Sequence, residues 1–235
     1  MLTTLLLTAA LAAASPLSPR QKTPLDYPPR FTGDAFTLIA NVTSSPPNPL
    51  FNPHHWVLST EQVGSGKYAA VLSPTGPGTV LFLNGTARDI SAENTSILAP
   101  PANLSTGVLP VGMQFNTAGQ RRVAVELNYG MGQVGAGIGI GLRDPYPRLF
   151  PPVSMQFGTF MVCKEPNPAP GAGRPEYPVY WARSGVVVVA ENCVGISLLA
   201  QCAPLPELAG VEKWNIIKAQ VGCYEDVKAI DWSQW

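Results

Sequence analysis

The chain carries little charge and no excess of either sign. Among its 235 residues, 15 lysines and arginines balance 15 acids, so charged residues make up 13% of the chain and the formal net charge is zero. An average soluble domain has about 25% charged residues. Without a basic field the chain has no electrostatic means of holding nucleic acid or docking on an anionic membrane. Because 46% of the residues are hydrophobic, the composition also excludes disorder of the highly charged kind.

Long hydrophobic runs are lacking, except for one at the N-terminus. Leu5–Ala14 has the length of a signal-peptide core, and Ala12 and Ala14 supply the small residues that cleavage requires. It is too short to cross a bilayer. We therefore predict a secreted protein with a signal peptide at residues 1–14 and no membrane span. A buried N-terminal helix is the alternative.

Signatures of metal, nucleophile and cofactor chemistry are lacking as well. The two histidines, His54 and His55, are adjacent and would point in opposite directions in an extended chain, and no third histidine can complete a metal site. The G-x-S-x-G motif of serine hydrolases is absent. Gly130–Gly135 matches the G-x-G-x-x-G pattern, but the glycine-rich residues after it cannot form the helix that a dinucleotide site needs. We predict no catalytic residue of these kinds, no cofactor and no metal.

One class of enzyme stays open. Glycoside hydrolases use two carboxylates that can lie far apart in sequence. Glu126, between Val125 and Leu127 in an expected strand, is the best candidate for a catalytic acid. An outward-facing position on that strand explains an acid there more simply. The available acids are Glu61, Asp89, Glu126, Asp144 and Glu191.

Glycine and proline are abundant, with 22 and 25 residues. They separate short stretches rich in β-branched and aromatic residues, which is the pattern of a sandwich or a barrel. The sequence therefore predicts an all-β fold, an antiparallel β-sandwich or barrel-like fold with a short C-terminal helix. The expected strands are Ala35–Thr43, Trp56–Thr60, Lys67–Ser73, Thr79–Leu83, Thr86–Ile90, Gly112–Phe115, Arg122–Leu127, Gly135–Leu142, Val153–Cys163, Val179–Trp181, Val186–Ala190 and Val194–Ala200.

The expected helix follows from apolar residues that recur every three positions between Pro206 and Gly222. These residues are Leu208, Val211, Trp214 and Ile217. The predicted organisation is a signal peptide (1–14), a proline-rich extended arm (15–34), a β-rich domain (35–204) and a C-terminal helical extension (205–235).

Two glycine motifs carry structural predictions. Asn84-Gly85 between apolar stretches is the strongest short hairpin signal, since both turn positions need positive φ. In the stretch 134–142, glycines alternate with apolar residues, so one face of a strand would be bare. A bare face favours close packing against another sheet, with a platform for a flat ligand as the alternative.

Four cysteines, Cys163, Cys193, Cys202 and Cys223, predict two disulfides in a secreted chain. The residues between Cys193 and Cys202 look like a strand, whose ends would lie about 30 Å apart. A disulfide holds its Cα atoms within about 7 Å, so these two cysteines are not expected to pair. We favour Cys163–Cys193 with Cys202–Cys223, and the crossed pairing stays open.

Four N-x-Ser/Thr sequons predict N-glycosylation, at Asn41, Asn84, Asn94 and Asn103. Asn84 is the favoured site because an Asn-Gly turn would project its side chain into solvent. Unmodified turn asparagines are the alternative.

A series of segments resembles an uncharacterised family of secreted fungal proteins, carried as a domain of unknown function. The resemblance covers about residues 30–204 and implies an extracellular β-rich domain, with no catalytic residues to carry over. The tail from Leu205 onward, including Cys223, departs from it. The segments are Phe36–Thr43, Trp56–Ser59, Gly64–Gly66, Ala69–Leu72, Phe82–Thr86, Gly158–Cys163 and Glu191–Cys202.

Two functional hypotheses follow. The first is a secreted, non-catalytic glycoprotein associated with a cell wall or host surface, which binds a polysaccharide or a surface protein through exposed aromatic rings. Trp56 and Phe150, beside proline-rich loops, are the candidate ligand contacts. The second is a secreted glycoside hydrolase with a carboxylate pair.

Overall fold

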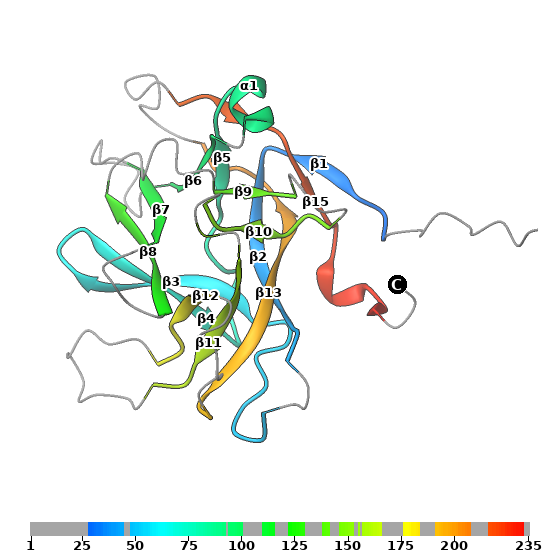
Figure 1. Cartoon of the computed structure of the whole chain (residues 1–235). Coiled ribbons are helices and arrows are strands. Elements are labelled where there is room, and N and C mark those ends of the chain that lie inside the picture. The colour runs from blue at the N-terminus through cyan, green and yellow to red at the C-terminus, as the bar shows by residue number, and fades with distance from the viewer. Residues whose placement is uncertain are drawn as a thin grey trace, which may run out of the picture.

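A computed structural model describes residues 28–44, 48–92, 94–100, 110–115, 122–129, 138–141, 146–152, 155, 157–165, 176–183, 191–207 and 216–232. Within these ranges the chain is built mainly from strands (Figure 1), as the sequence predicted. The strands are β1 (Phe31–Gly33), β2 (Ala35–Val42), β3 (Val57–Gly64), β4 (Lys67–Ser73), β5 (Phe82–Asn84), β6 (Ser96–Ala99), β7 (Val111–Phe115), β8 (Arg122–Tyr129), β9 (Gly139–Ile140), β10 (Leu149–Phe150), β11 (Gly158–Cys163), β12 (Val179–Arg183), β13 (Cys193–Ala203), β14 (Lys218–Ala219) and β15 (Val221–Cys223). The helices are α1 (Ala87–Ser91) and a 3-10 helix, η4 (Val227–Ala229).

The main sheet is antiparallel and closes on itself. It has 11 strands in the order β12-β11-β13-β2-β3-β4-β8-β7-β6-β5-β14, and β12 pairs additionally with β8. That extra pairing joins the two ends of the run from β12 to β8, so this part of the sheet forms a barrel-like ring. The remaining strands continue outward from β8. Within this ring, closure leaves no strand edge free to pair with other chains.

The core lies inside this sheet and continues on its outer side. Phe36, Leu38 and Ala40, which alternate along β2 and so share one face, are fully buried in the main core. Ile39, on the opposite face, is also buried, in a second cluster with Tyr224 of the C-terminal segment. The outer face of β2 and β13 is therefore covered by the chain that follows β15.

Both disulfides have the favoured pairing. Cys163–Cys193 joins the neighbouring strands β11 and β13, and Cys202–Cys223 joins β13 to β15. Cys193 and Cys202 lie on the same strand, as expected, which keeps them apart. No free cysteine is present.

The expected hairpin at Asn84-Gly85 is wrong, because Thr86–Ile90 forms most of a helix rather than a strand. Thr86 caps α1: its hydroxyl accepts a hydrogen bond from the Asp89 backbone N–H at 3.1 Å, and Asp89 Oδ2 accepts one from the Thr86 backbone N–H at 2.7 Å. This capping box gives partners to the backbone N–H groups of Thr86 and Asp89. In a strand, such groups would need partners on a neighbouring strand. Gly85 alone takes a positive φ, 156°, where a type I′ turn needs two such residues.

A short helix does lie near the C-terminus, but further along the chain than expected. Between Pro206 and Gly222, the residues at 208–215 lie outside the described part, whereas Lys218–Ala219 and Val221–Cys223 are strands. Strand β15 pairs with β1, and β14 pairs with β5. Of the four residues that predicted the helix, Leu208, Val211 and Trp214 lie outside the described residues, so that helix stays a prediction.

Only part of the glycine-alternating stretch is a described strand. β9 pairs with β10 over two residues, and it ends where Gly141 takes a φ of 65°. Ile138 and Ile140 are buried in the main core. The expected glycine face at 135 and 137 and the expected strand at 186–190 lie outside the described residues.

Candidate functional site

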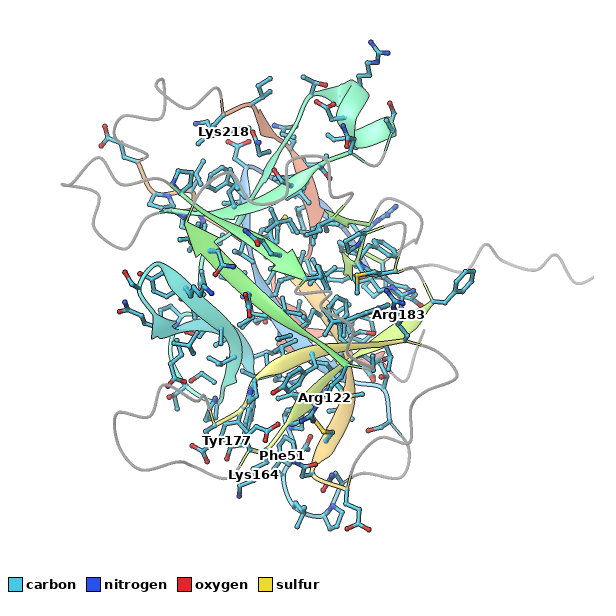
Figure 2. All side chains as sticks on the ribbon, turned by 60° about the vertical axis from the view of Figure 1, so that its left-hand side comes forward. Phe51, Arg122, Lys164, Tyr177, Arg183 and Lys218 are labelled. Atoms are coloured by element: carbon cyan, nitrogen blue, oxygen red, sulfur yellow. A yellow bond between two sulfur atoms is a disulfide. The ribbon has the colours of Figure 1, made fainter. Side chains whose placement is uncertain are left out.

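An aromatic cluster of Phe51, Trp56 and Tyr177 forms at one end of the barrel. Trp56 and Tyr177 meet edge to face with ring centroids 4.9 Å apart, and Phe51 lies 6.2 Å from Trp56 and 5.7 Å from Tyr177. Each ring is partly buried against the main core and partly accessible. Figure 2 shows Phe51 and Tyr177 at the lower end of the molecule in that view. Each ring is thus anchored in the fold and keeps some accessible surface.

The loop that carries Phe51 and Trp56 is held by hydrogen bonds of the Asn48 side chain. Asn48 Nδ2 donates to the backbone oxygens of Glu191 at 2.8 Å and Cys193 at 3.2 Å, which ties the loop to the start of β13. The Leu50 backbone N–H donates to Asn48 Oδ1 at 2.8 Å. Loops fixed in this way lose little conformational entropy when they bind a ligand.

The histidine pair behaves differently from the expectation. The rings of His54 and His55 stack with centroids 3.8 Å apart instead of pointing in opposite directions. The reason is that His55 has a φ of 66°, so the chain is not extended there. Burial lowers the pKa of both imidazoles below the ordinary 6.5. The described residues contain no group of three potential metal ligands.

Tyr177 contributes a hydroxyl to the aromatic cluster. Burial raises the pKa of this phenol above its ordinary value, and a hydrogen bond to the neighbouring Glu176 carboxylate raises it further. The single O–H of Tyr177 is thus engaged with Glu176, and the phenol oxygen can still accept a hydrogen bond from a ligand.

Phe150, the second predicted contact, does not join this cluster. It lines a separate pocket of about 120 Å³, where the Arg148 guanidinium carbon lies 5.5 Å from the centre of its ring. The structure thus assigns the two predicted residues to two different places. The pocket is lined by Arg148, Leu149, Phe150, Pro151, Gly158, Thr159, Phe160, Trp181, Ile196 and Ser197.

Glu126, the most enzyme-like acid, lies on β8 among polar groups. Its Oε2 accepts a hydrogen bond from Asn128 Nδ2 at 3.1 Å, and it lines neither of the two pockets described here. Asp89 caps α1, Glu61 and Glu191 are exposed, and Asp144 lies outside the described residues. A hydrolase with a carboxylate pair stays a hypothesis.

The sequons differ in their surroundings. Asn94 is exposed and Asn41 is partly exposed on β2, while Asn103 lies outside the described residues. The expectation that Asn84 projects into solvent is wrong: its side chain is 9% exposed and hydrogen-bonded at both ends of the amide. The reason is that Asn84 sits between β6 and the segment entering β14.

Sequence reasoning missed a second groove, of about 440 Å³, where the two ends of the described chain meet. It combines apolar residues with three acids, and only the β1–β15 pairing brings its parts together. No local pattern could have indicated it. The groove is lined by Pro28, Pro29, Phe31, Tyr224, Glu225, Asp226, Ala229, Ile230 and Asp231.

No helix among the described residues is long and apolar enough to span a membrane. Comparison with known proteins gives three findings. A family described as a domain of unknown function (DUF7907) matches residues 33–202. An antigenic protein of Stachybotrys chartarum, SchS34, is 27% identical over 94% of this chain and 99% of its own length. The full-length CARDS toxin is 8% identical with a TM-score of 0.44, over 78% of this chain and 29% of the toxin, a likeness that supports no conclusion.

Proposed function

The chain belongs to the family defined by the domain of unknown function DUF7907, and we propose that this member is a secreted, non-catalytic glycoprotein that binds a polysaccharide or a protein of a cell wall or host surface. The aromatic cluster of Phe51, Trp56 and Tyr177 is the observation that carries the proposal.

Aromatic rings suit sugar binding for a physical reason. They offer a large apolar area that can stack on the apolar face of a sugar ring, and they lose little conformational entropy because they have only two χ angles. Three rings within 6.2 Å of one another make a surface larger than any one of them could offer. The Tyr177 hydroxyl adds a polar group at the same place.

Three further observations support an extracellular role. Both disulfides close within the fold, and disulfides persist in oxidising compartments outside the cytosol. A relative covering almost the whole chain is named an antigenic protein, and proteins that meet an immune system are commonly released or surface-bound. The exposed sequon at Asn94 fits the same environment.

The low charge of the chain predicts how binding should respond to salt. With charged residues at 13% and no net charge, few ion pairs can contribute to an interface. Screening by salt weakens interactions between exposed charges and leaves apolar stacking largely unaffected. Binding should therefore change little between low and moderate ionic strength.

Co-sedimentation of the secreted protein with insoluble chitin and β-1,3-glucan tests the proposal. Trp56→Ala and Tyr177→Ala should weaken binding by about tenfold or more, since each removes a ring worth at least ~1.4 kcal/mol of stacking. Phe157→Ala is the matched control, because Phe157 is 75% exposed and lies outside the cluster. Circular dichroism must show that each variant is folded.

Equal binding by all the variants would refute the aromatic cluster as the site. If the protein binds neither polymer, a protein array of host and wall surface proteins tests the other half of the proposal. Release of soluble sugar that is lost in Glu126→Gln would instead support the hydrolase hypothesis.

A further inference from the structure

The two histidines of the chain, His54 and His55, form a stacked pair in the loop of residues 48–56, directly before Trp56 of the aromatic cluster. Their ring centroids lie 3.8 Å apart. They are the only side chains of this protein whose ordinary pKa falls between pH 5 and pH 8, because all four cysteines are in disulfides. Acidification within this interval should therefore act mainly on this pair.

The backbone around the pair is held in an uncommon conformation. His55 has a φ of 66°, in the left-handed region, and no other non-glycine residue among the described ones has a positive φ. The His55 N–H donates to the Ala40 oxygen at 2.8 Å, and the Ala40 N–H donates to the Trp56 oxygen at 2.8 Å. These two bonds continue the pairing of β2 with β3 at Ile39 and Val57. Such a backbone conformation persists only where its surroundings hold it, so weaker contacts would release the loop.

The ring of His55 is poorly suited to a second proton. Its Nε2 is buried and, within the described part of the chain, has no hydrogen-bond partner. In the neutral ring this nitrogen can be the one without a hydrogen, whereas the protonated ring carries an N–H at both nitrogens. Because a buried N–H without an acceptor is costly, the closed loop favours the neutral ring. Burial lowers the pKa of both histidines accordingly.

The neighbouring charges also oppose a proton on His55. After burial, the two largest effects are the His54 ring and Lys228 of η4, which both lower the pKa of His55, while Asp226 raises it less. Asp226 is also engaged elsewhere, since its Oδ1 accepts a hydrogen bond from the Lys228 backbone N–H at 2.9 Å. Protonation of both rings would place two cations at a centroid distance of 3.8 Å, with the Lys228 ammonium repelling one of them.

We propose that the stacked histidine pair is an acid-sensitive switch that releases the loop of residues 48–56 from β2. Near neutral pH both rings are uncharged, and the loop keeps the conformation that positions Trp56. As the pH falls below the ordinary pKa of 6.5, the open loop takes up protons that the closed loop excludes, so acid favours the open state. This effect is complete once the pH has passed below the lowered pKa values of the closed state.

The switch acts on the aromatic cluster, and this consequence rests on the proposed function. Trp56 is tied to β2 through its backbone oxygen, one of the atoms that the opening would separate from Ala40. The cluster would therefore lose the fixed position of one of its three rings. Binding of an uncharged polymer should be weaker at pH 5 than at pH 7.5, although the polymer itself does not titrate.

Hydrogen exchange of single amides, measured by NMR on the secreted protein at both pH values and corrected for intrinsic rates, tests the switch. The Ala40 and His55 amides report the two bonds between β2 and the loop. The Leu81 amide, which donates to the Phe36 oxygen at 2.8 Å at the other end of β2, is the reference. Protection at Ala40 and His55 should fall at least about threefold in acid, and protection at Leu81 should fall less. No fall, or an equal fall at all three amides, would overturn the proposal.

The double variant His54→Phe, His55→Asn should lose this acid dependence. Phenylalanine keeps a ring for stacking, and asparagine tolerates a left-handed φ. If the double variant fails to fold, two charge variants test the same switch. Lys228→Met should make the fall in protection smaller, and Asp226→Asn, which keeps a capping side chain for η4, should make it larger. A fall that is the same in all the variants would contradict the switch.

Co-sedimentation with insoluble chitin and β-1,3-glucan at pH 7.5 and pH 5 separates the switch from the proposed function. Affinity should be at least about threefold lower at pH 5, and unchanged by pH in the double variant. If neither polymer binds at pH 7.5, polysaccharide binding by the cluster fails, while the exchange measurement still decides the switch. Equal binding at both pH values, with acid-dependent exchange, would overturn the control of the cluster by the switch.

Discussion

The side-chain oxygen of Asn84 accepts a hydrogen bond from the backbone N–H of Ile217 at 2.9 Å, across 133 residues of sequence. The amide nitrogen of the same side chain donates to Ser96 Oγ at 3.3 Å. Asn84 therefore connects three segments: its own strand β5, the neighbouring β6 and the chain that enters β14. A residue that looks like part of a surface turn in the sequence has a structural role.

Replacing Asn84 tests that role. Asn84→Ala leaves a backbone N–H and a serine hydroxyl without their partner, which should lower the free energy of unfolding by about 1–3 kcal/mol. Asn94→Ala, at an exposed position, should change it by no more than about 0.5 kcal/mol. Urea denaturation of both variants after enzymatic deglycosylation makes the comparison, and equal stabilities would contradict the role assigned to Asn84.

Glycan occupancy should follow exposure. We expect N-glycans on at least two of Asn41, Asn84, Asn94 and Asn103, with Asn94 occupied most fully and Asn84 least. The reason is that a glycan on Asn84 would have to displace the hydrogen bonds to Ile217 and Ser96. Mass spectrometry after deglycosylation in ¹⁸O-water measures occupancy at each site. High occupancy at Asn84 would show that the chain is modified before β5 and β14 meet, or that these contacts are dispensable.

Removal of the Cys202–Cys223 disulfide should destabilise the protein and release its C-terminal segment. The double variant Cys202→Ala, Cys223→Ala should lose about 2–4 kcal/mol of unfolding free energy, because the cross-link restricts the unfolded chain. Hydrogen exchange should increase first at β1 and β15, which pair with each other beside this bridge. The double variant of Cys163 and Cys193 is the control: it should be destabilised without selective loss of protection at β1.

The cap of α1 should make the local stability depend on pH. Hydrogen bonds from the Thr86 side chain and backbone lower the pKa of Asp89 below its ordinary 3.8. A lowered pKa means that the folded state favours the ionised Asp89 carboxylate. This carboxylate therefore stabilises the cap of α1 above about pH 4, and the stabilisation is lost as the pH falls through the lowered pKa. An NMR titration of the Asp89 carboxyl carbon checks the direction, and Thr86→Val should return the pKa toward 3.8. An Asp89 pKa at or above 3.8 would refute the capping box.

The sequence predicted the fold class well because alternation and turn signals are local properties. The inward residues of β2 and the strand that separates Cys193 from Cys202 follow from such patterns. The strand excludes a disulfide between these two cysteines, but the choice between the two remaining pairings depends on which strands are neighbours. The strand expected at 86–90 is wrong because a helical cap is a competing local solution there. The strands at 218–223 are decided by partners elsewhere in the chain.

The candidate sites were only partly accessible to sequence reasoning. Trp56 could be named because it follows a proline-rich loop, but its neighbour Tyr177 comes from the segment before β12, more than a hundred residues later. The pocket at Phe150 is lined by residues of four separate segments, which no local pattern brings together. The resemblance to a family without a known function could add no site residues.

The pairing of β1 with β15 also determines when folding can be completed. β1 is the first strand in chain order, and its partner β15 comes close to the end of the described chain. A chain synthesised from its N-terminus must therefore keep β1 unpaired until β15 has been made, and contacts this distant in sequence form slowly. The outer surface of β2 and β13 stays uncovered for the same interval. The Cys202–Cys223 disulfide can form only at this late step, and it then holds β15 against β13.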